Sequence, residues 1–152
     1  MSDIDEKVLI HAPLASAARF LERFRAAHAT PNGDGARVEL RAGDLAKHAV
    51  VTLVPEHRAG DMTPRYTVHW EAEEPGPYPV FDGILTVAGD EDYNAFWLVL
   101  DGGYKPPGGL AGGLFDALVG HRIAETVTHG LFDTIRSEIE AAFSEEERAK
   151  RA

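Results

Sequence analysis

The sequence predicts an α+β domain in which a curved antiparallel sheet of about six strands wraps around a long C-terminal helix. Strand-like stretches follow one another without helices between them, which favours antiparallel pairing of neighbours. A stretch of about thirty residues, roughly 111–143, carries apolar side chains at helical spacing. A sheet that covers a helix of this length must curl around it.

The N-terminal part supplies one strand and one amphipathic helix. Residues 7–12 form the predicted strand, and Pro13 suits the first turn of the helix that follows. Apolar side chains then recur at three- and four-residue steps up to His28, with charged residues between them. The glycine-containing stretch 30–35 is predicted to end this helix as a loop.

Five further strands are predicted before the C-terminal helix, namely 36–41, 47–55, 65–72, 80–88 and 93–102. Successive side chains of a strand point to opposite faces, so Tyr66, Val68 and Trp70 share one face of their strand. Glycines and prolines in 102–109 predict a rigid corner between the last strand and the helix, where Tyr104 leans over a cavity mouth. The elements fill one domain, 1–152, whose charged tail from about 144 is expected to fray.

Composition and charge narrow the classes of function. The 152 residues are 44% hydrophobic and 26% charged, carry a formal net charge of −10 and contain no cysteine. The missing thiols exclude disulfides and Cys-based zinc sites. The acidic balance disfavours nucleic acid or an anionic membrane surface as partner, and it otherwise keeps a protein in solution. Neither a signal sequence nor an apolar run of roughly 20 residues is present, so we expect a cytoplasmic protein without stable membrane insertion, as a monomer or weak dimer.

A space between the sheet and the C-terminal helix is expected wherever facing side chains are small, as at Gly83, Gly120 and Ala124. Such a space is lined by the same inward-facing positions that form the core. The candidate ligand-binding residues are Tyr66, Val68, Trp70, Phe81, Gly83, Leu85, Phe96, Leu98, Leu100, Tyr104, Leu114, Ala117, His121, Ala124 and Thr128.

His121 is the most informative of these residues. On the helical wheel it falls with Thr128 inside the apolar stripe, next to Leu114 and Ile139. A buried imidazole or hydroxyl without a partner costs about 1–3 kcal/mol, so each needs a protein group, a water or a ligand. His121 is therefore a core histidine bonded to the sheet, a polar anchor for a ligand or a general base.

Other chemical motifs are absent or incomplete. His121, Glu125 and His129 spread over about 80° of the wheel and lack the His-Glu-x-x-His pattern, which argues against a metal face. The stretch 102–109 lacks the Gly-Lys-Ser/Thr ending of a phosphate loop. No Gly-x-Ser-x-Gly elbow is present. We expect neither a metal nor a cofactor.

The order strand, helix, strands, long helix resembles the START-like, helix-grip superfamily, which includes pollen-allergen and polyketide-cyclase branches. Two stretches, 78–87 and 98–124, are similar to an uncharacterised bacterial branch. The resemblance implies a cavity for a hydrophobic ligand such as a lipid, sterol, polyketide or quinone-like molecule, and it carries over no catalytic motif. The chain departs from the usual pattern near 31–35, where a glycine-rich loop replaces a second helical segment.

Three hypotheses follow. The first is a binding protein for a small apolar molecule, which is not an enzyme. The second is a cyclase- or dehydratase-type enzyme with His121 or Tyr66 as the acid–base group. The third is an interaction module without a ligand, which would expose an apolar patch of several hundred Å².

Overall fold

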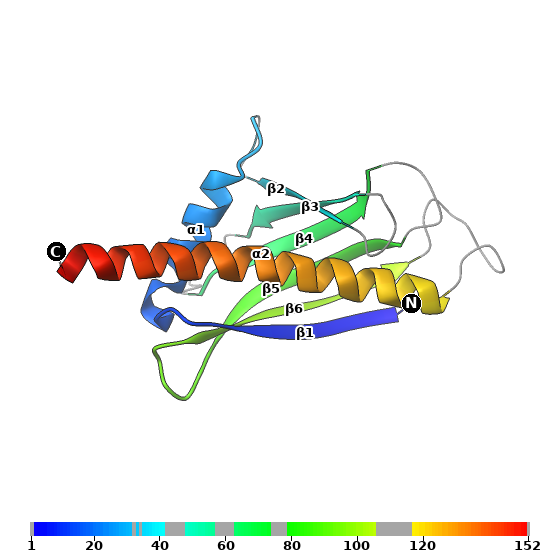
Figure 1. The fold of residues 1–152 in the computed structure, drawn as a ribbon. Helices are drawn as coiled ribbons and strands as arrows, with labels where there is room; N and C mark the ends of the chain where they lie inside the picture. Colours follow the sequence, from blue (N-terminus) through cyan, green and yellow to red (C-terminus); the bar gives the residue numbers. More distant parts are fainter. Residues whose placement is uncertain are drawn as a thin grey trace.

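The computed structural model describes residues 2–31, 33, 35–41, 48–56, 63–73, 79–105 and 117–151. The elements are β1 (Ser2–Ile10), η1 (Leu14–Ser16), α1 (Ala17–Ala27), β2 (Ala36–Arg41), β3 (His48–Pro55), β4 (Arg65–Ala72), β5 (Val80–Gly89), β6 (Phe96–Lys105) and α2 (Ala117–Arg151). The strands form one antiparallel sheet in the order β1-β6-β5-β4-β3-β2. The predicted fold class is confirmed, with α2 laid along one face of the sheet (Figure 1).

The sheet curls so that its two edge strands come closest to α2. Within the described residues, the main backbone contacts of α2 with the sheet are made by β1 and β2, which are the edge strands. The central strands stand further back, and large side chains fill the intervening layer. Among the largest fully buried side chains there are Trp70, Phe81, Phe96, Leu98 and Leu100.

The strand register arranges the inner face in rows that run across the sheet. Trp70 pairs with Phe81 and Phe81 with Tyr104, so three aromatic side chains from adjacent strands form one row. Four residues along each strand, Tyr66 pairs with Leu85 and Leu85 with Leu100. The inward face predicted for these strands is therefore the face that the structure buries.

Between these rows, Gly83 on β5 pairs with Gly102 on β6. A Cβ at Gly83 would lie 2.6 Å from the Phe81 ring, and a Cβ at Gly102 would lie 2.6 Å from the same ring. The Phe81 ring thus lies against both glycines. The expectation that Gly83 leaves a gap was wrong, because this ring occupies the space.

Several predicted boundaries differ from the structure; the strand predicted at 7–12, for example, is β1, Ser2–Ile10. β6 continues through Gly102 and Gly103 to Lys105, so Tyr104 sits on the inner face of a strand instead of at a corner. The tail that was expected to fray is helical up to Arg151. Glu146 binds Arg19 and Glu147 binds Lys150, and these ion pairs support the last turns. Leu114 lies outside the described residues, and of Ala117 only the backbone is described.

The outer face of the sheet places two carboxyl groups opposite each other. Asp5 on β1 and Asp101 on β6 are register partners. Burial, followed by the hydrogen bond and the charge of Asp5, raises the pKa of Asp101 above its ordinary value. A raised carboxyl pKa means that the folded protein loses stability as the pH rises through that pKa.

We expect Asp101→Asn to raise the free energy of unfolding at pH 7 by a few tenths of a kcal/mol, since like charges directly opposite each other destabilise a sheet. At pH 3, where the carboxyl is protonated, the gain should vanish. Denaturant titration at both pH values measures this. Asp82→Asn is the control, because Asp82 accepts a 2.7 Å hydrogen bond from His69 and should give no gain; an equal gain in both variants would contradict the explanation.

Candidate functional site

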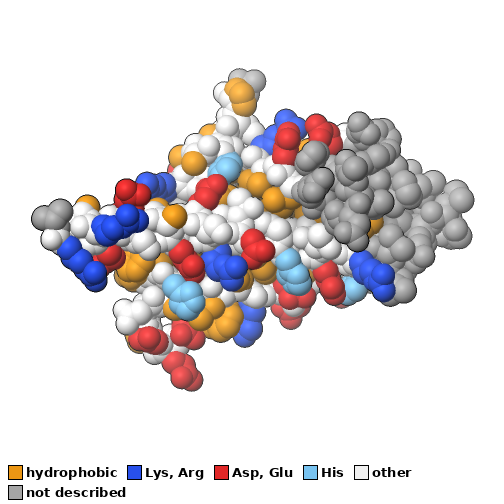
Figure 2. Space-filling view, in the orientation of Figure 1, with side chains coloured by type: hydrophobic (Ala, Val, Ile, Leu, Met, Phe, Trp, Pro, Cys, Tyr) orange, Lys and Arg blue, Asp and Glu red, His pale blue; other side chains and the backbone are white. Residues whose placement is uncertain are grey.

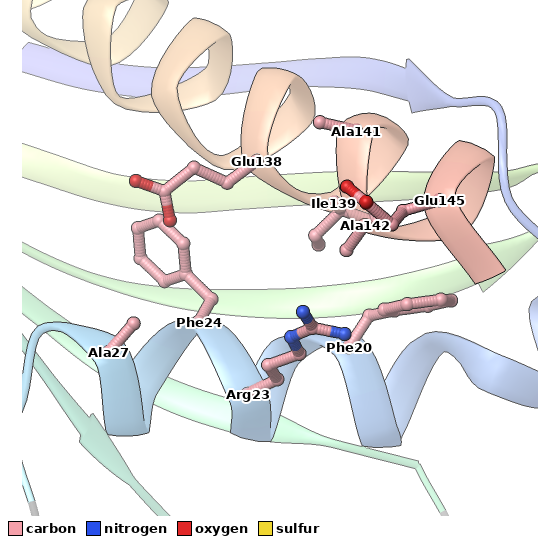
Figure 3. Close-up of a pocket in the computed structure, with 9 residues that line it drawn as sticks. All are labelled: Phe20, Arg23, Phe24, Ala27, Glu138, Ile139, Ala141, Ala142 and Glu145. Carbon is pink, nitrogen blue, oxygen red and sulfur yellow. The ribbon is translucent and has the colours of Figure 1, made fainter.

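A groove of about 320 Å³ lies between α1 and the C-terminal half of α2. Figure 3 shows side chains from both helices converging on it. Its apolar side chains come from both helices, and charged groups lie among them. The lining residues are Phe20, Arg23, Phe24, Ala27, Glu138, Ile139, Ala141, Ala142 and Glu145.

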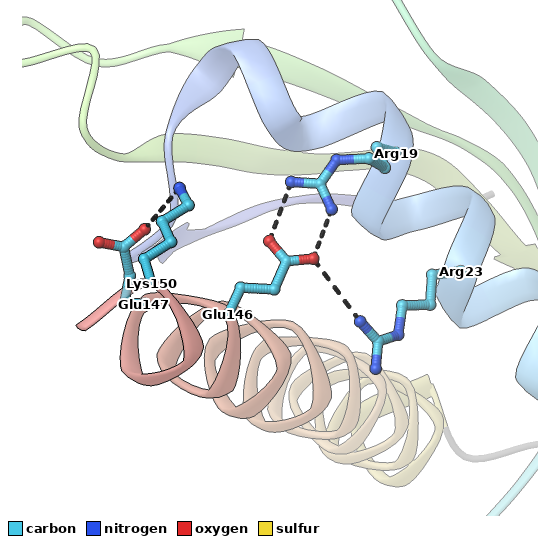
Figure 4. Close-up of polar contacts among 5 residues, drawn as sticks. All are labelled: Arg19, Arg23, Glu146, Glu147 and Lys150. Atoms are coloured by element: carbon cyan, nitrogen blue, oxygen red, sulfur yellow. Dashed lines mark hydrogen bonds and ion pairs between the residues drawn. The ribbon is translucent and has the colours of Figure 1, made fainter. Parts of the chain in front are cut away.

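Ion pairs join the two helices on either side of this groove. At one end, His28 Nε2 lies 2.8 Å from Glu138 Oε1. At the other end, Arg19 forms two hydrogen bonds to Glu146, of 2.6 and 3.1 Å, and Arg23 lies 3.8 Å from the same carboxylate (Figure 4). The hydrogen bond from Arg19 holds the pKa of Glu146 below its ordinary value. Charged pairs therefore bridge the two helices at both ends of the groove.

Phe24 borders both this groove and a second, half-open hollow. Its ring lines the groove and also lines this second hollow, of only about 10 Å³, on the inner side of α1. Tyr66 and Leu85 from the sheet and Ile135 from α2 line this inner hollow. Burial, more than the nearby charge of Glu22, raises the pKa of Tyr66 to about 12. A volume of this size holds one water at most.

A second polar arrangement lies near the start of α2. The Tyr104 hydroxyl lies 3.1 Å from His121 Nδ1, and His121 Nε2 lies 2.6 Å from Glu125 Oε1. A carboxylate only accepts hydrogen bonds, so the imidazole proton belongs on Nε2 and Tyr104 donates to Nδ1. Tyr104 is 3% exposed, whereas 43% of the His121 side chain is exposed. His121 therefore lies at the edge of the apolar stripe rather than inside it.

Two fully buried polar atoms have no hydrogen-bond partner in the described part of the chain. They are Trp70 Nε1 on β4 and Thr128 Oγ1 on α2. Trp70 stacks on Phe81 with a centroid distance of 5.7 Å and an interplanar angle of 10°. Both atoms belong to the layer between the inner face of the sheet and α2.

The structure separates the predicted site residues into two groups. Trp70, Phe81, Tyr104 and His121 gather at the N-terminal end of α2, whereas Tyr66 and Leu85 lie at the level of Ile135. Ile135 is about 21 Å from His121 along the helix axis, so Tyr66 and His121 do not form one acid–base pair. Of the remaining described candidates, Gly83 is half-buried, and the others are buried core positions, namely Val68, Phe96, Leu98, Leu100, Ala124 and Thr128.

Sequence reasoning missed the groove. Its apolar residues Phe20, Phe24 and Ile139 were visible as parts of two amphipathic stripes. Helical periodicity shows which side of a helix is apolar, but it does not show which helix packs beside it. The partner of His121 was missed too, because Tyr104 was placed in a loop.

The exposed surface of α2 mixes charges. Figure 2 shows acidic, basic and histidine side chains side by side along this helix. In the described ranges, no group of three or more His, Asp or Glu side chains is arranged to hold a metal ion. None of the described helices combines the length and apolarity needed to span a membrane.

Comparison with known proteins identifies the fold. No protein-family model and no curated protein matches the chain. A START superfamily protein from Mycobacterium smegmatis superposes with a TM-score of 0.54 at 10% identity, over 95% of this chain and 99% of its own. A conserved protein from Geobacillus kaustophilus gives 0.58 at 12% identity, over 94% and 95%. An uncharacterized protein from Bacillus thuringiensis gives 0.52 at 12% identity, over 93% and 98%. The chain has the START-like, helix-grip fold.

The hydrogen bonds of His121 predict its tautomer. Long-range ¹H–¹⁵N NMR of neutral His121 should show the proton on Nε2 and a bare Nδ1. In Glu125→Ala this preference should weaken, because the acceptor that fixes it is gone. His129, whose Nε2 is 3.8 Å from Glu6, serves as the internal reference. A neutral ring with its proton on Nδ1 in the unaltered protein would contradict the arrangement.

Proposed function

We propose that the protein binds a small apolar molecule, such as a lipid, sterol, polyketide or quinone-like compound, between the inner face of the sheet and α2. The supporting observation is the position of Phe24. One side of its ring borders an open groove of about 320 Å³, and the other borders a hollow lined by Tyr66 and Leu85. In this proposal Phe24 is the side chain that moves to admit the ligand to the layer in which the predicted binding residues lie.

The hollow beside Tyr66 measures only about 10 Å³, which is too small for such a molecule. Binding therefore requires side chains to move, with Phe24 turning into the groove beside it. The ion pairs at the two ends of the groove lie near the surface, where such pairs contribute little to stability. Separating α1 from α2 at this groove should therefore cost little free energy. The START-like resemblance supports a hydrophobic ligand.

The third hypothesis, an interaction module, has less support. It predicts a continuous exposed apolar patch. Among the described residues, the exposed large apolar side chains are Val54 on β3 and Tyr93 on the β5–β6 turn, which belong to separate elements. Neither belongs to a groove-lining set.

An acid–base enzyme is the second candidate, and the chain Tyr104–His121–Glu125 favours it. A buried hydroxyl that is bonded to a half-exposed imidazole can exchange a proton with solvent through that ring. Tyr104, not Tyr66, would be the partner of His121 in this function. Deuterium exchange at the central carbon of an enolisable aromatic diketone, accelerated by the protein and lost in Tyr104→Phe, would establish it; no acceleration would remove this candidate.

Native mass spectrometry and organic extraction of freshly purified protein test the binding function. We expect a copurified apolar molecule, or saturable binding of the neutral fluorescent probe N-phenyl-1-naphthylamine by protein that has been stripped of lipid. Absence of both would contradict the proposal.

The access route has its own test. Phe24→Leu should accelerate probe association several-fold, because the smaller side chain weakens the barrier. Leucine keeps most of the buried volume. The free energy of unfolding should therefore fall by much less than in a Phe→Ala change, which typically costs about 3–5 kcal/mol. Phe143→Leu is the control, since Phe143 packs on Phe20 at the same helix pair without lining either hollow. Equal rates in both variants would exclude this route.

A further inference from the structure

Trp70 carries a hydrogen-bond donor that the described protein does not use. Its side chain is 1% exposed, and Nε1 has no partner within the described residues. An indole nitrogen only donates, so a donor from a ligand cannot satisfy it. The ligand must therefore offer a hydrogen-bond acceptor to Trp70 Nε1. In an apolar interior this acceptor is usually an oxygen atom with free lone pairs.

Thr128 is the second unused polar group, and other threonines of α2 show that this is unusual. Thr126 Oγ1 donates to the Arg122 carbonyl at 2.8 Å, and Thr134 Oγ1 donates to the Gly130 carbonyl at 2.9 Å. Thr128 is 0% exposed and lacks such a bond within the same helix. Its hydroxyl is therefore unpaired at the position where an unpaired hydroxyl costs most.

Both groups border the same layer. Trp70 is on the inner face of β4, in the aromatic row that ends at Tyr104. Thr128 belongs to the buried face of α2, between Ala124 and Leu131. Trp70 and Tyr104 are two strands apart, which places their Cα atoms about 10 Å from each other.

We propose that the bound molecule is an apolar compound with a carbonyl-type oxygen, as in a ketone or quinone, which accepts a hydrogen bond from Trp70 while Thr128 supplies a second polar contact. This inference rests on the proposed function. It excludes a plain acyl chain as the preferred occupant, because hydrocarbon would leave both buried groups unpaired.

A matched pair of probes tests the oxygen. 2-Acetylnaphthalene and 2-isopropenylnaphthalene have nearly the same shape, and only the first has a carbonyl. We expect the ketone to bind about tenfold tighter, as one buried hydrogen bond implies. In Trp70→Phe the preference should fall to about twofold or less. Trp97→Phe is the control, because Trp97 Nε1 already donates to Asp90 at 3.2 Å.

Thr128→Val supplies an independent readout that does not need Trp70 to be replaced. Valine has the shape of threonine without the hydroxyl, so the unliganded variant should melt at a higher temperature than the original protein while its preference for the ketone falls. Thr134→Val should show neither change, since it removes a hydroxyl that is already bonded.

The results with the two probes distinguish failure of this inference from failure of the proposed binding function. Equal affinity for both probes overturns the inference and leaves apolar binding intact. Failure of both probes to bind overturns both. A high-resolution structure that shows ordered water on Trp70 Nε1 and Thr128 Oγ1, together with no preference for the ketone, would assign these atoms to buried water alone.

Discussion

The curl of the sheet around α2 is the constraint on which the rest of the structure depends. Because β1 and β2 approach the helix from the two edges, the central strands β4, β5 and β6 must stand back from it. That layer is too wide for small side chains, and aromatic rings fill it. Gly83 and Gly102 fit this constraint, because the absence of two side chains lets the Phe81 ring lie against both strands. The layer between the sheet and α2 thus combines aromatic rings with aliphatic side chains from both elements.

The two ends of α2 contribute in different ways. Its C-terminal half is joined to α1 by charged pairs that include Glu138 and Glu146, with Phe24 closing the seam between them. Its N-terminal half holds a polar chain from Tyr104 through His121 to solvent. A molecule in the layer between would meet an apolar barrier at one end and hydrogen-bonding groups at the other. Under the proposed function, this asymmetry would orient a ligand that has one polar end.

The sequence was sufficient for the element order and for the inward faces. Alternation in β4 placed Tyr66, Val68 and Trp70 on the buried side, because a strand shifted by one residue would expose them all. Alternation does not show which residues of different strands pair with each other. Gly102 looks like the end of a strand until it is paired with Gly83, and this is why Tyr104 was expected in a loop. The α1–α2 groove depends on which two amphipathic helices meet, which periodicity alone does not encode.

Trp70 and Thr128 connect the fold to its proposed function. Burying their polar atoms without hydrogen-bond partners lowers the free energy of unfolding, and a ligand that pairs with them would restore it. The most direct measurement is a crystal structure, at a resolution that shows ordered water, of protein purified without exposure to organic solvent. We predict continuous non-protein density between the aromatic row and α2, ending within hydrogen-bond distance of Trp70 Nε1. A closed interior in which Trp70 and Thr128 both donate to protein carbonyls would contradict the account.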